Sequence, residues 1–428
     1  MNDMSNAAEL TDLAPDEMVA KLAKNGRAAQ RKLARMGDSQ KAEALRAAAA
    51  AIRQAEATIL EANAKDIAAG EARGLSSAML DRLKLDSERL EGIAGAIENV
   101  AALPDPVGEE ISRSQAPAGM TLVRRRIPIG LIGIIYESRP NVTADAASLC
   151  LRSGNAALLR GGSEAVHSNR ALHAAFVEGA SQEGVPAGAI QLMPTQDREA
   201  VGAMLKAAGL IDMIVPRGGK GLVARVQEDA RVPVLAHLDG ICHTYIDEEA
   251  DPGMAKDIAL NAKMRRTGIC GAMETLLIDQ GFKSAPDVLA ALLDAGCELR
   301  GDARAQEIDD RIKPAEGDDW DTEYLDAILS VAIVAGIGEA MEHISQHSSG
   351  HTDAIVTSDD AAAERFLAEV DSAIVMHNAS SQFADGGEFG LGAEIGIATG
   401  RLHARGPVAL EGLTTYKWQV LGQGQARS

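Results

Sequence analysis

A cysteine flanked by glycines is the residue in this sequence best suited to covalent chemistry. The segment LNAKMRRTGICGAMETLL (260–277) places Cys270 between Gly268 and Gly271. Small neighbours leave a sulfur atom accessible, and nearby cations favour the thiolate form, which is the nucleophile. The cations close to it in sequence are Lys263, Arg265 and Arg266. The alternative is a buried thiol that packs as a small hydrophobe, which is a common role for free cysteine.

The other three cysteines show no such surroundings. Cys150 and Cys297 stand among apolar and helix-forming residues, and we predict that both are packing residues. Cys242, in LDGICHTYID, is left open between the two roles. No pair forms a CxxC motif, and four cysteines in 428 residues do not make a disulfide framework, so we expect a reducing compartment such as the cytoplasm.

A glycine-rich turn suggests a nucleotide. The segment IDMIVPRGGKGLVARV (211–226) has the pattern of a strand, a turn and the start of a helix. Gly219, Gly221 and Ala224 fit G-x-G-x-x-A, a variant of the dinucleotide-binding turn. A plain turn between a strand and a helix is the alternative. A P-loop is excluded because no serine or threonine follows Lys220.

Three histidines fall four residues apart in EHISQHSSGHTD, namely His343, His347 and His351. Histidines at i and i+4 on a helix can bind zinc. However, SSG interrupts the helix before His351, and the glutamate of an H-E-x-x-H motif is missing. We therefore predict no metal site.

The elements that must position these residues alternate between strands and helices. Short aliphatic runs occur at 131–135, 156–159, 190–193, 211–215, 232–237 and 243–247, and a second series occurs at 275–279, 328–334, 352–357 and 372–376. Helical segments at 163–179 and 221–229 lie between them, which indicates βαβ units. Residues 15–72 have helical periodicity, and the glycine-rich stretch 380–406 is predicted to be a functional loop.

Composition limits the possible partners. The formal net charge is −20, which disfavours binding to nucleic acid or to an anionic membrane surface. The most apolar runs are much shorter than the ~20 residues of a membrane span. The acidic first residues have no apolar core, so no signal peptide is expected.

At the level of whole segments, the sequence resembles the aldehyde dehydrogenase superfamily, and within it the branch that reduces an acyl phosphate. The resemblance is carried by PIGLIGIIYESRPNVTADAASLC (128–150), RRTGICGAMETLL (265–277), NASSQFADGGEFGLGAEIGIATG (378–400) and LHARGP (402–407), among other segments. It implies an α/β fold with two doubly wound domains and a small β flap for oligomerisation.

The resemblance also implies a division of the chain. Residues 1–247 would form the NADP-binding domain, with the 118–130 hairpin belonging to the flap. Residues 248–385 would form the catalytic domain. Residues 386–428 would return to the cofactor domain and end in a strand, 413–422, that pairs with a neighbouring subunit of a homodimer or homotetramer.

Individual roles follow from the matched positions. Cys270 matches the catalytic thiol, and Glu323 matches the glutamate that holds the nicotinamide ribose. Arg160 stands where a lysine usually contacts the adenosine ribose, and Ser163 replaces a glutamate of NAD-preferring relatives, so NADP is the expected cofactor. Gly218, Gly219 and Gly221 match the turn that faces the pyrophosphate.

Two departures from the superfamily pattern carry information. His237 stands in place of the glutamate that activates water in hydrolytic relatives, which suits an enzyme that does not hydrolyse its thioester. In the oxyanion hole, the usual asparagine aligns nearest Arg139, whereas Asn141 lies two residues further on, and we favour Asn141.

The resemblance therefore implies NADPH-dependent reduction of L-glutamate 5-phosphate to the 5-semialdehyde, as in proline biosynthesis. Candidate cations for the substrate anions are Arg139, Arg265, Arg266 and Arg405. Glutamate 5-kinase is a possible partner for substrate hand-over. The alternatives are a hydrolytic aldehyde dehydrogenase, which His237 disfavours, and a non-catalytic dinucleotide-binding protein, which the thiol between glycines disfavours.

Overall fold

The computed structural model describes residues 10–427, and these divide into two compact units. The first unit contains the chain up to Ala236, together with Leu391–Gly396 and the residues from Val408 onward; the second contains His237–Gly390 and Ile397–Pro407. The predicted domain boundary after residue 247 differs from this division. The reason is that the strand β7 (Cys242–Ile246) pairs with strands of the second unit.

The first unit is built on a four-stranded parallel sheet of order β5-β4-β3-β6. Its strands are β3 (Leu131–Tyr136), β4 (Ala156–Gly161), β5 (Ile190–Leu192) and β6 (Met213–Arg217). The strands β3 and β4 are buried along their whole length, which matches their continuous apolar runs. The segment 232–237, predicted as a strand, forms only a single bridge between Val234 and Ile214.

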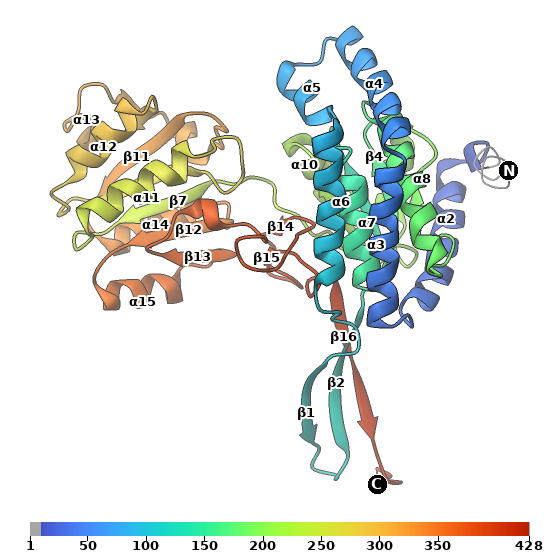
Figure 1. The fold of residues 1–428 in the computed structure, drawn as a ribbon. Coiled ribbons are helices and arrows are strands. Elements are labelled where there is room, and N and C mark those ends of the chain that lie inside the picture. The colour runs from blue at the N-terminus through green and yellow to red at the C-terminus, as the bar shows by residue number, and fades with distance from the viewer. Residues whose placement is uncertain (1–9, 428) are drawn as a thin grey trace. The chain divides into compact units, whose positions relative to one another are not determined.

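Helices cover this sheet (Figure 1). They are α2 (Pro15–Leu33), α3 (Asp38–Gln54), α4 (Glu56–Ala72), α5 (Ser77–Leu83), α6 (Ser87–Ala102), α7 (Val142–Arg152), α8 (Val166–Gln182), α9 (Arg198–Lys206) and α10 (Lys220–Asp229). Helices α2 and α9 pack on the sheet in one apolar core, whereas α7 packs on β3 and β4 and also contacts α3, α6 and α8. The predicted helices in 15–72 are confirmed.

The second unit contains a seven-stranded parallel sheet of order β10-β9-β11-β8-β7-β12-β13. Besides β7, its strands are β8 (Met273–Asp279), β9 (Glu298–Gly301), β10 (Lys313–Pro314), β11 (Ile328–Val334), β12 (Thr352–Val356) and β13 (Ile374–His377). Its helices are α11 (Pro252–Met264), α12 (Ala285–Asp294), α13 (Ala303–Gln306), α14 (Ile337–His347) and α15 (Asp360–Glu369), with the 3₁₀ turns η1 (Gly317–Asp321) and η2 (Ser381–Phe383).

Both faces of this second sheet are covered. Leu276 and Ile333 point into the core beneath α11 and α12, while their chain neighbours Leu277 and Val334 point into the core beneath α14. Because successive side chains of a strand face opposite sides, helices are needed on both faces. A short antiparallel pair, β14 (Ile397–Ala398) and β15 (Gly406–Pro407), completes the unit.

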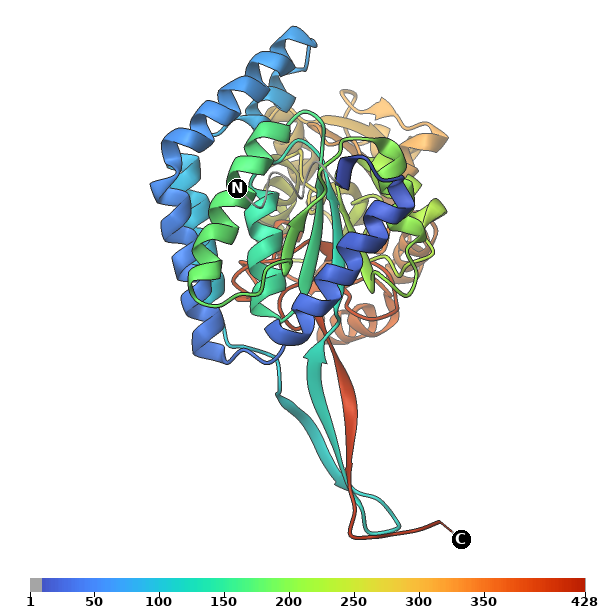
Figure 2. The same ribbon diagram turned by 90° about the vertical axis from the view of Figure 1, so that its right-hand side faces the viewer.

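A three-stranded antiparallel ribbon belongs to the first unit and extends away from its helices (Figures 1 and 2). It consists of β1 (Glu110–Gln115), β2 (Thr121–Pro128) and β16 (Thr414–Leu421), with β2 in the centre. The hairpin arm and the C-terminal strand predicted from sequence are therefore confirmed as one sheet. In residues 10–427, no helix has the length and apolar composition that crossing a membrane requires.

Candidate active site

The candidate nucleophile, Cys270, lies in the turn that joins α11 to β8. Cys270 lies three residues before β8 and is half-buried, whereas Cys150, Cys242 and Cys297 are buried. Burial raises the pKa of Cys150 and of Cys297 to about 12, which confirms both as packing thiols. Of the four cysteines, Cys270 is thus the one that is not fully buried.

The backbone of Cys270 is held closely by its neighbours in space. A Cβ atom on Gly240 would lie 2.6 Å from Cys270 Cα, so only glycine fits at position 240 without a shift. The Cys242 thiol, at the start of β7, donates a hydrogen bond to the carbonyl oxygen of Cys270 at 3.1 Å. The role of Cys242, which the sequence left open, is therefore to pack against the active-site turn.

Two histidines stand beside the Cys270 thiol. One imidazole nitrogen of His237, one of His351 and the Cys270 sulfur all lie within 4.8 Å of one another. The two rings make an edge contact with centroids 5.1 Å apart. His237 Nδ1–H donates to the carbonyl oxygen of Ile397 at 2.8 Å, so the lone pair of the neutral ring is on Nε2.

His351 is fully buried just before β12, and burial, with His237 adding to the effect, lowers the pKa of His351 to about 3. Its ring is therefore neutral near pH 7. Its Nδ1 lies 2.9 Å from Thr352 Oγ1 and 3.6 Å from the Cys242 sulfur, whereas its buried Nε2 has no hydrogen-bond partner. The sequence analysis did not connect His351 with the thiol.

The other two histidines of the EHISQHSSGHTD segment have different neighbours. His347 Nδ1 pairs with Asp321 at 2.9 Å, and the His343 ring packs on Trp320 at 5.1 Å between centroids. Among residues 10–427, these two histidines do not form a ligand cluster with His351. The reason is that His351 lies beyond the end of α14, at the edge of the next strand.

Glu323 lies in the segment between η1 and β11 and is partly buried. It adjoins a buried ion pair in which Lys263 Nζ lies 2.5 Å from Glu274 Oε2. Burial raises the pKa of Glu274 to about 7, with Lys263 opposing that shift and Glu323 adding to it. This pair anchors α11 to β8 directly beneath the turn that carries Cys270.

The predicted substrate cations of the second unit differ in their surroundings. Arg265 and Arg266 are exposed at the end of α11, where Arg265 Nη1 donates to Gln382 Oε1 at 3.4 Å. Arg405, in contrast, forms an ion pair with Asp371 at 2.6 Å and donates to the Thr399 carbonyl oxygen. Its guanidinium therefore ties the 397–407 segment to the loop between α15 and β13.

In the first unit, Arg160 is the penultimate residue of β4 and is almost fully buried. Its Nη2 donates to the carbonyl oxygen of Gln196 at 3.0 Å, and its Nε is buried without a hydrogen-bond partner. Ser163 is exposed in the following turn. The neighbouring Glu164 accepts a hydrogen bond from the Ser138 hydroxyl at 3.0 Å, so its carboxylate is held by the adjacent loop.

The predicted dinucleotide turn joins β6 to α10, with Gly219 as the N-cap of the helix. Side chains at Gly219 and Gly221 would meet nothing within 4 Å, whereas a Cβ at Gly218 would lie 2.5 Å from Glu137 Oε2. That carboxylate also accepts a hydrogen bond from Gly219 N at 3.3 Å. The space beside Gly219 and Gly221 is therefore open, and the backbone of the turn already binds one anionic group, the Glu137 carboxylate.

Asn141 and Arg139 lie in the loop from β3 to α7, where Arg139 is exposed. Asn141 Nδ2 donates to Asp145 Oδ2 at 2.8 Å, which fixes the orientation of the amide. Burial raises the pKa of Asp145 to about 6, and the hydrogen bond from Asn141 opposes that shift. One amide proton of Asn141 therefore points to Asp145. Because the amide group is planar, this hydrogen bond also fixes the direction of the second amide proton.

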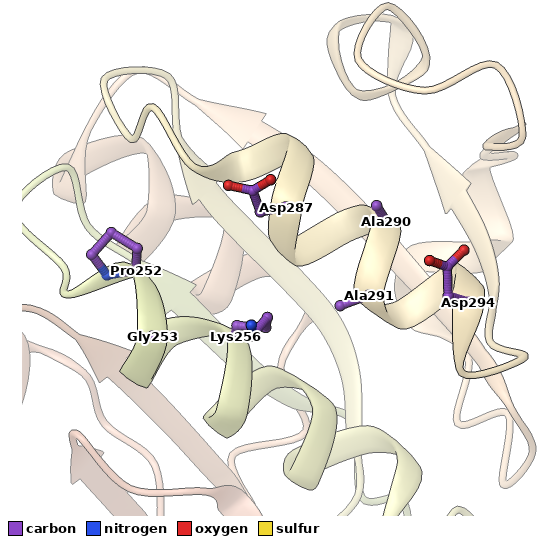
Figure 3. A pocket seen from close by; sticks show the side chains of 7 residues that line it. All are labelled: Pro252, Gly253, Lys256, Asp287, Ala290, Ala291 and Asp294. Atoms are coloured by element: carbon purple, nitrogen blue, oxygen red, sulfur yellow. The ribbon is translucent and has the colours of Figure 1, made fainter.

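A shallow pocket of about 370 Å³ lies between α11 and α12 (Figure 3). Its polar side chains are Lys256, Asp287 and Asp294, and it contains no residue predicted for the site. One lysine and two carboxylates give this pocket a net negative charge and no thiol, so it suits an anionic acyl substrate poorly, and the chemistry is assigned to the Cys270 cluster.

Comparison with known proteins identifies the family of this chain. A sequence profile described as "Aldehyde dehydrogenase family" matches residues 6–309. The chain is 72% identical over 420 residues to the γ-glutamyl phosphate reductase of Novosphingobium aromaticivorans, covering 98% of this chain and 99% of the relative. It is 65% identical to the same enzyme of Rhizorhabdus wittichii, with 97% and 98% covered.

A solved structure extends the comparison to the fold. The crystal structure of γ-glutamyl phosphate reductase from Thermotoga maritima matches with a TM-score of 0.94 and 41% identity, covering 96% of this chain and 100% of that one. The expected aldehyde dehydrogenase-like α/β fold is thereby confirmed. This chain belongs to the aldehyde dehydrogenase family, in the group formed by the γ-glutamyl phosphate reductases.

Proposed function

We propose that the protein reduces L-glutamate 5-phosphate to L-glutamate 5-semialdehyde and phosphate, with NADPH as reductant and Cys270 as nucleophile. The reductase names of the relatives support the reaction. The observation that carries the mechanism is the half-buried Cys270 thiol, which has two imidazoles beside it. At the His237 position, hydrolytic members of the family have a carboxylate base instead.

The covalent step uses groups of the second unit. His237 Nε2 accepts the thiol proton, and the resulting thiolate attacks the acyl carbonyl carbon. A sulfur–carbon bond forms while the bond from carbon to the phosphate oxygen breaks, and phosphate leaves with that electron pair. Phosphate is a good leaving group and needs no strong acid. The product is a thioester on Cys270.

Stabilisation of the oxyanion is assigned to backbone N–H groups near Cys270 and to the Asn141 amide. The hydrogen bond from Asn141 Nδ2 to Asp145 supports this role, because it leaves the second amide proton in a defined direction. Arg139, Arg265 and Arg266 are the exposed cations proposed to attract the substrate carboxylate and phosphate. Arg405 is proposed to act through its ion pair with Asp371, as a support for the loop.

The described residues fit a nicotinamide dinucleotide. The buried Nε of Arg160 lacks a partner, and the turn at Gly218, Gly219 and Gly221 exposes backbone at the start of α10. Arg160 and Ser163 would hold the 2′-phosphate, and Glu323 would hold the nicotinamide ribose. When bound, NADPH supplies the hydride that reduces the thioester.

The absence of a carboxylate base at position 237 protects the thioester from water. After the attack His237 carries the proton of the Cys270 thiol, so it cannot act as a base for water, and transfer to phosphate or reduction outcompetes hydrolysis. The reaction in reverse should then need phosphate. We also propose that the enzyme acts in proline biosynthesis in the cytoplasm, receiving its labile acyl phosphate from glutamate 5-kinase.

The exposed end of β16 supports the proposal of a homo-oligomer. Tyr416, Trp418 and Val420 are about half exposed on this ribbon strand. The Arg124 guanidinium lies 4.9 Å from the Tyr416 ring, so the surface combines apolar and cationic groups. A neighbouring subunit would cover it. Trp418→Asp should therefore shift the native mass to that of a smaller species in light scattering, and an unchanged mass would remove this role.

The proposed reaction is tested in the oxidative direction. Purified protein is mixed with glutamate 5-semialdehyde, NADP and inorganic phosphate, and NADPH absorbance is followed. We expect turnover with phosphate and almost none without it. Release of free glutamate in phosphate-free buffer at a similar rate would show a hydrolytic enzyme instead. Mass spectrometry of protein quenched with L-glutamate 5-phosphate should locate the acyl group on Cys270.

A further inference from the structure

The cluster of His237, Cys270 and His351 has the composition of a transition-metal site. One ligand atom of each residue lies within 4.8 Å of the other two. Around a tetrahedral Zn²⁺ with ordinary Zn–S and Zn–N bonds, such atoms are about 3.5 Å apart. Bringing the three atoms to these distances needs side-chain movements of about 1 Å. The thiol can make such a movement by a change of rotamer, because Cys270 lies on a turn rather than within a strand.

The three residues meet because of the order of the strands. Cys270 precedes β8, His351 precedes β12, and β7 lies between these two strands in the sheet. The amino-terminal ends of three parallel neighbours therefore bring together residues that are far apart in sequence. A sheet edge of this kind is rigid, so the ligands are held near one another before any ion arrives.

His351 supplies an independent observation. Its side chain is fully buried, and its Nε2 has no hydrogen-bond partner. Placing the ring proton on Nδ1 satisfies Thr352 Oγ1 at 2.9 Å and leaves the lone pair of the buried Nε2 without a hydrogen-bond donor. A buried polar atom without a partner is costly, and a bound cation would remove that cost.

His237 has the second shell that metal-binding histidines typically have. Its Nδ1–H donates to the Ile397 carbonyl oxygen at 2.8 Å, which fixes the ring and directs the lone pair of Nε2 away from that carbonyl. Cys242 adds a similar support, because its sulfur contacts His351 Nδ1 at 3.6 Å and its thiol donates to the Cys270 carbonyl oxygen. Both histidines are thus oriented by groups outside the cluster.

We infer that these three residues bind Zn²⁺, or a similar borderline divalent ion, and that the ion reversibly blocks the nucleophile. Two imidazoles and a thiolate suit zinc and exclude Mg²⁺ and Ca²⁺, which need oxygen ligands. Three protein ligands leave the fourth position to water. The net charge of −20 attracts cations to the protein. The inhibitory consequence rests on the proposed function, whereas the binding site itself does not.

The binding test uses Co²⁺ as a spectroscopic probe on the full-length, metal-free enzyme. We expect one Co²⁺ per chain, with a thiolate-to-cobalt charge-transfer band and intense d–d bands typical of a tetrahedral ion. Addition of Zn²⁺ should displace the cobalt and abolish both. Cys270→Ala should eliminate the charge-transfer band, and His351→Asn or His237→Ala should weaken binding by at least about 100-fold.

His347→Asn is the matched control, because His347 belongs to the same segment but pairs with Asp321 outside the cluster. It should leave cobalt binding unchanged. If His351→Asn does not yield folded protein, cobalt binding is compared in Cys270→Ala and His237→Ala instead. A wild-type spectrum without a thiolate band, or an identical spectrum in Cys270→Ala, would overturn the site.

The functional consequence is measured separately. Zn²⁺ should inhibit phosphate-dependent NADP reduction by wild-type enzyme, and a chelator should restore it fully. If the protein binds cobalt through Cys270 but has no reductase activity, the proposed function is refuted and the metal site is still supported. Full activity at saturating zinc would refute the blocking role, whatever the spectrum.

Discussion

Gly240→Ala should reduce catalysis strongly without touching any reactive group. The new methyl carbon would lie 2.6 Å from Cys270 Cα and 2.8 Å from its carbonyl carbon, whereas ordinary contacts begin at 3.4 Å. The Cys270 carbonyl oxygen is closer still, so the active-site turn must move by at least about 0.8 Å, because the obstacle is backbone and cannot rotate away. A misplacement of about 1 Å typically costs about 100-fold in rate, equivalent to about 2.7 kcal/mol in the activation barrier.

The assay is kcat/KM for phosphate-dependent oxidation of glutamate 5-semialdehyde, with the rate of Cys270 alkylation as a second measurement. Both should fall in Gly240→Ala. Gly338→Ala is the matched control, because a Cβ there meets no atom within 4 Å and the residue lies in α14. It should retain normal activity. A folded Gly240→Ala enzyme with kcat/KM within threefold of wild type would refute the proposed role of this backbone contact.

Three further predictions follow from other parts of the structure. Cys270→Ala and Cys270→Ser should lose at least about 10³-fold in kcat, roughly 4 kcal/mol, while Cys297→Ala should lose stability only; a folded Cys270→Ala enzyme that keeps a tenth of wild-type activity would contradict covalent catalysis. The wild-type enzyme should prefer NADP over NAD by about 10- to 100-fold in kcat/KM, and Arg160→Gln should bring this ratio close to one. An unchanged ratio would mean that other residues bind the 2′-phosphate. Lys263→Met should cost about 3–5 kcal/mol of unfolding free energy at neutral pH, because it leaves Glu274 buried and unpaired. Burial alone then raises the folded-state pKa of Glu274 above its unfolded value, so this loss should shrink as pH falls below the unfolded value and both states become protonated. Equal losses at low and neutral pH in urea titrations would show that packing, not charge, is responsible.

The sequence alone determined the local elements and singled out Cys270 as the candidate nucleophile. Continuous aliphatic runs and period-3.6 patterns reflect which faces of an element are buried, so they identified the strands β3, β8 and β11 and the helices of residues 15–72. The glycines around Cys270 indicated an accessible sulfur, and the structure agrees that this is the one half-buried thiol of the four. The segment 232–237 was predicted as a strand but pairs with β6 only through one bridge, between Val234 and Ile214.

Only the tertiary structure decided which distant residues meet. His351 is separated from Cys270 by 80 intervening residues in sequence, and it reaches the thiol because β12 and β8 flank β7 in the sheet. Strand order is set by long-range packing of both sheet faces, and it leaves no local pattern to read. The same holds for Arg405, a candidate substrate cation by sequence whose charge is paired with Asp371. Local sequence specifies what each side chain can do, and the fold decides what it can reach.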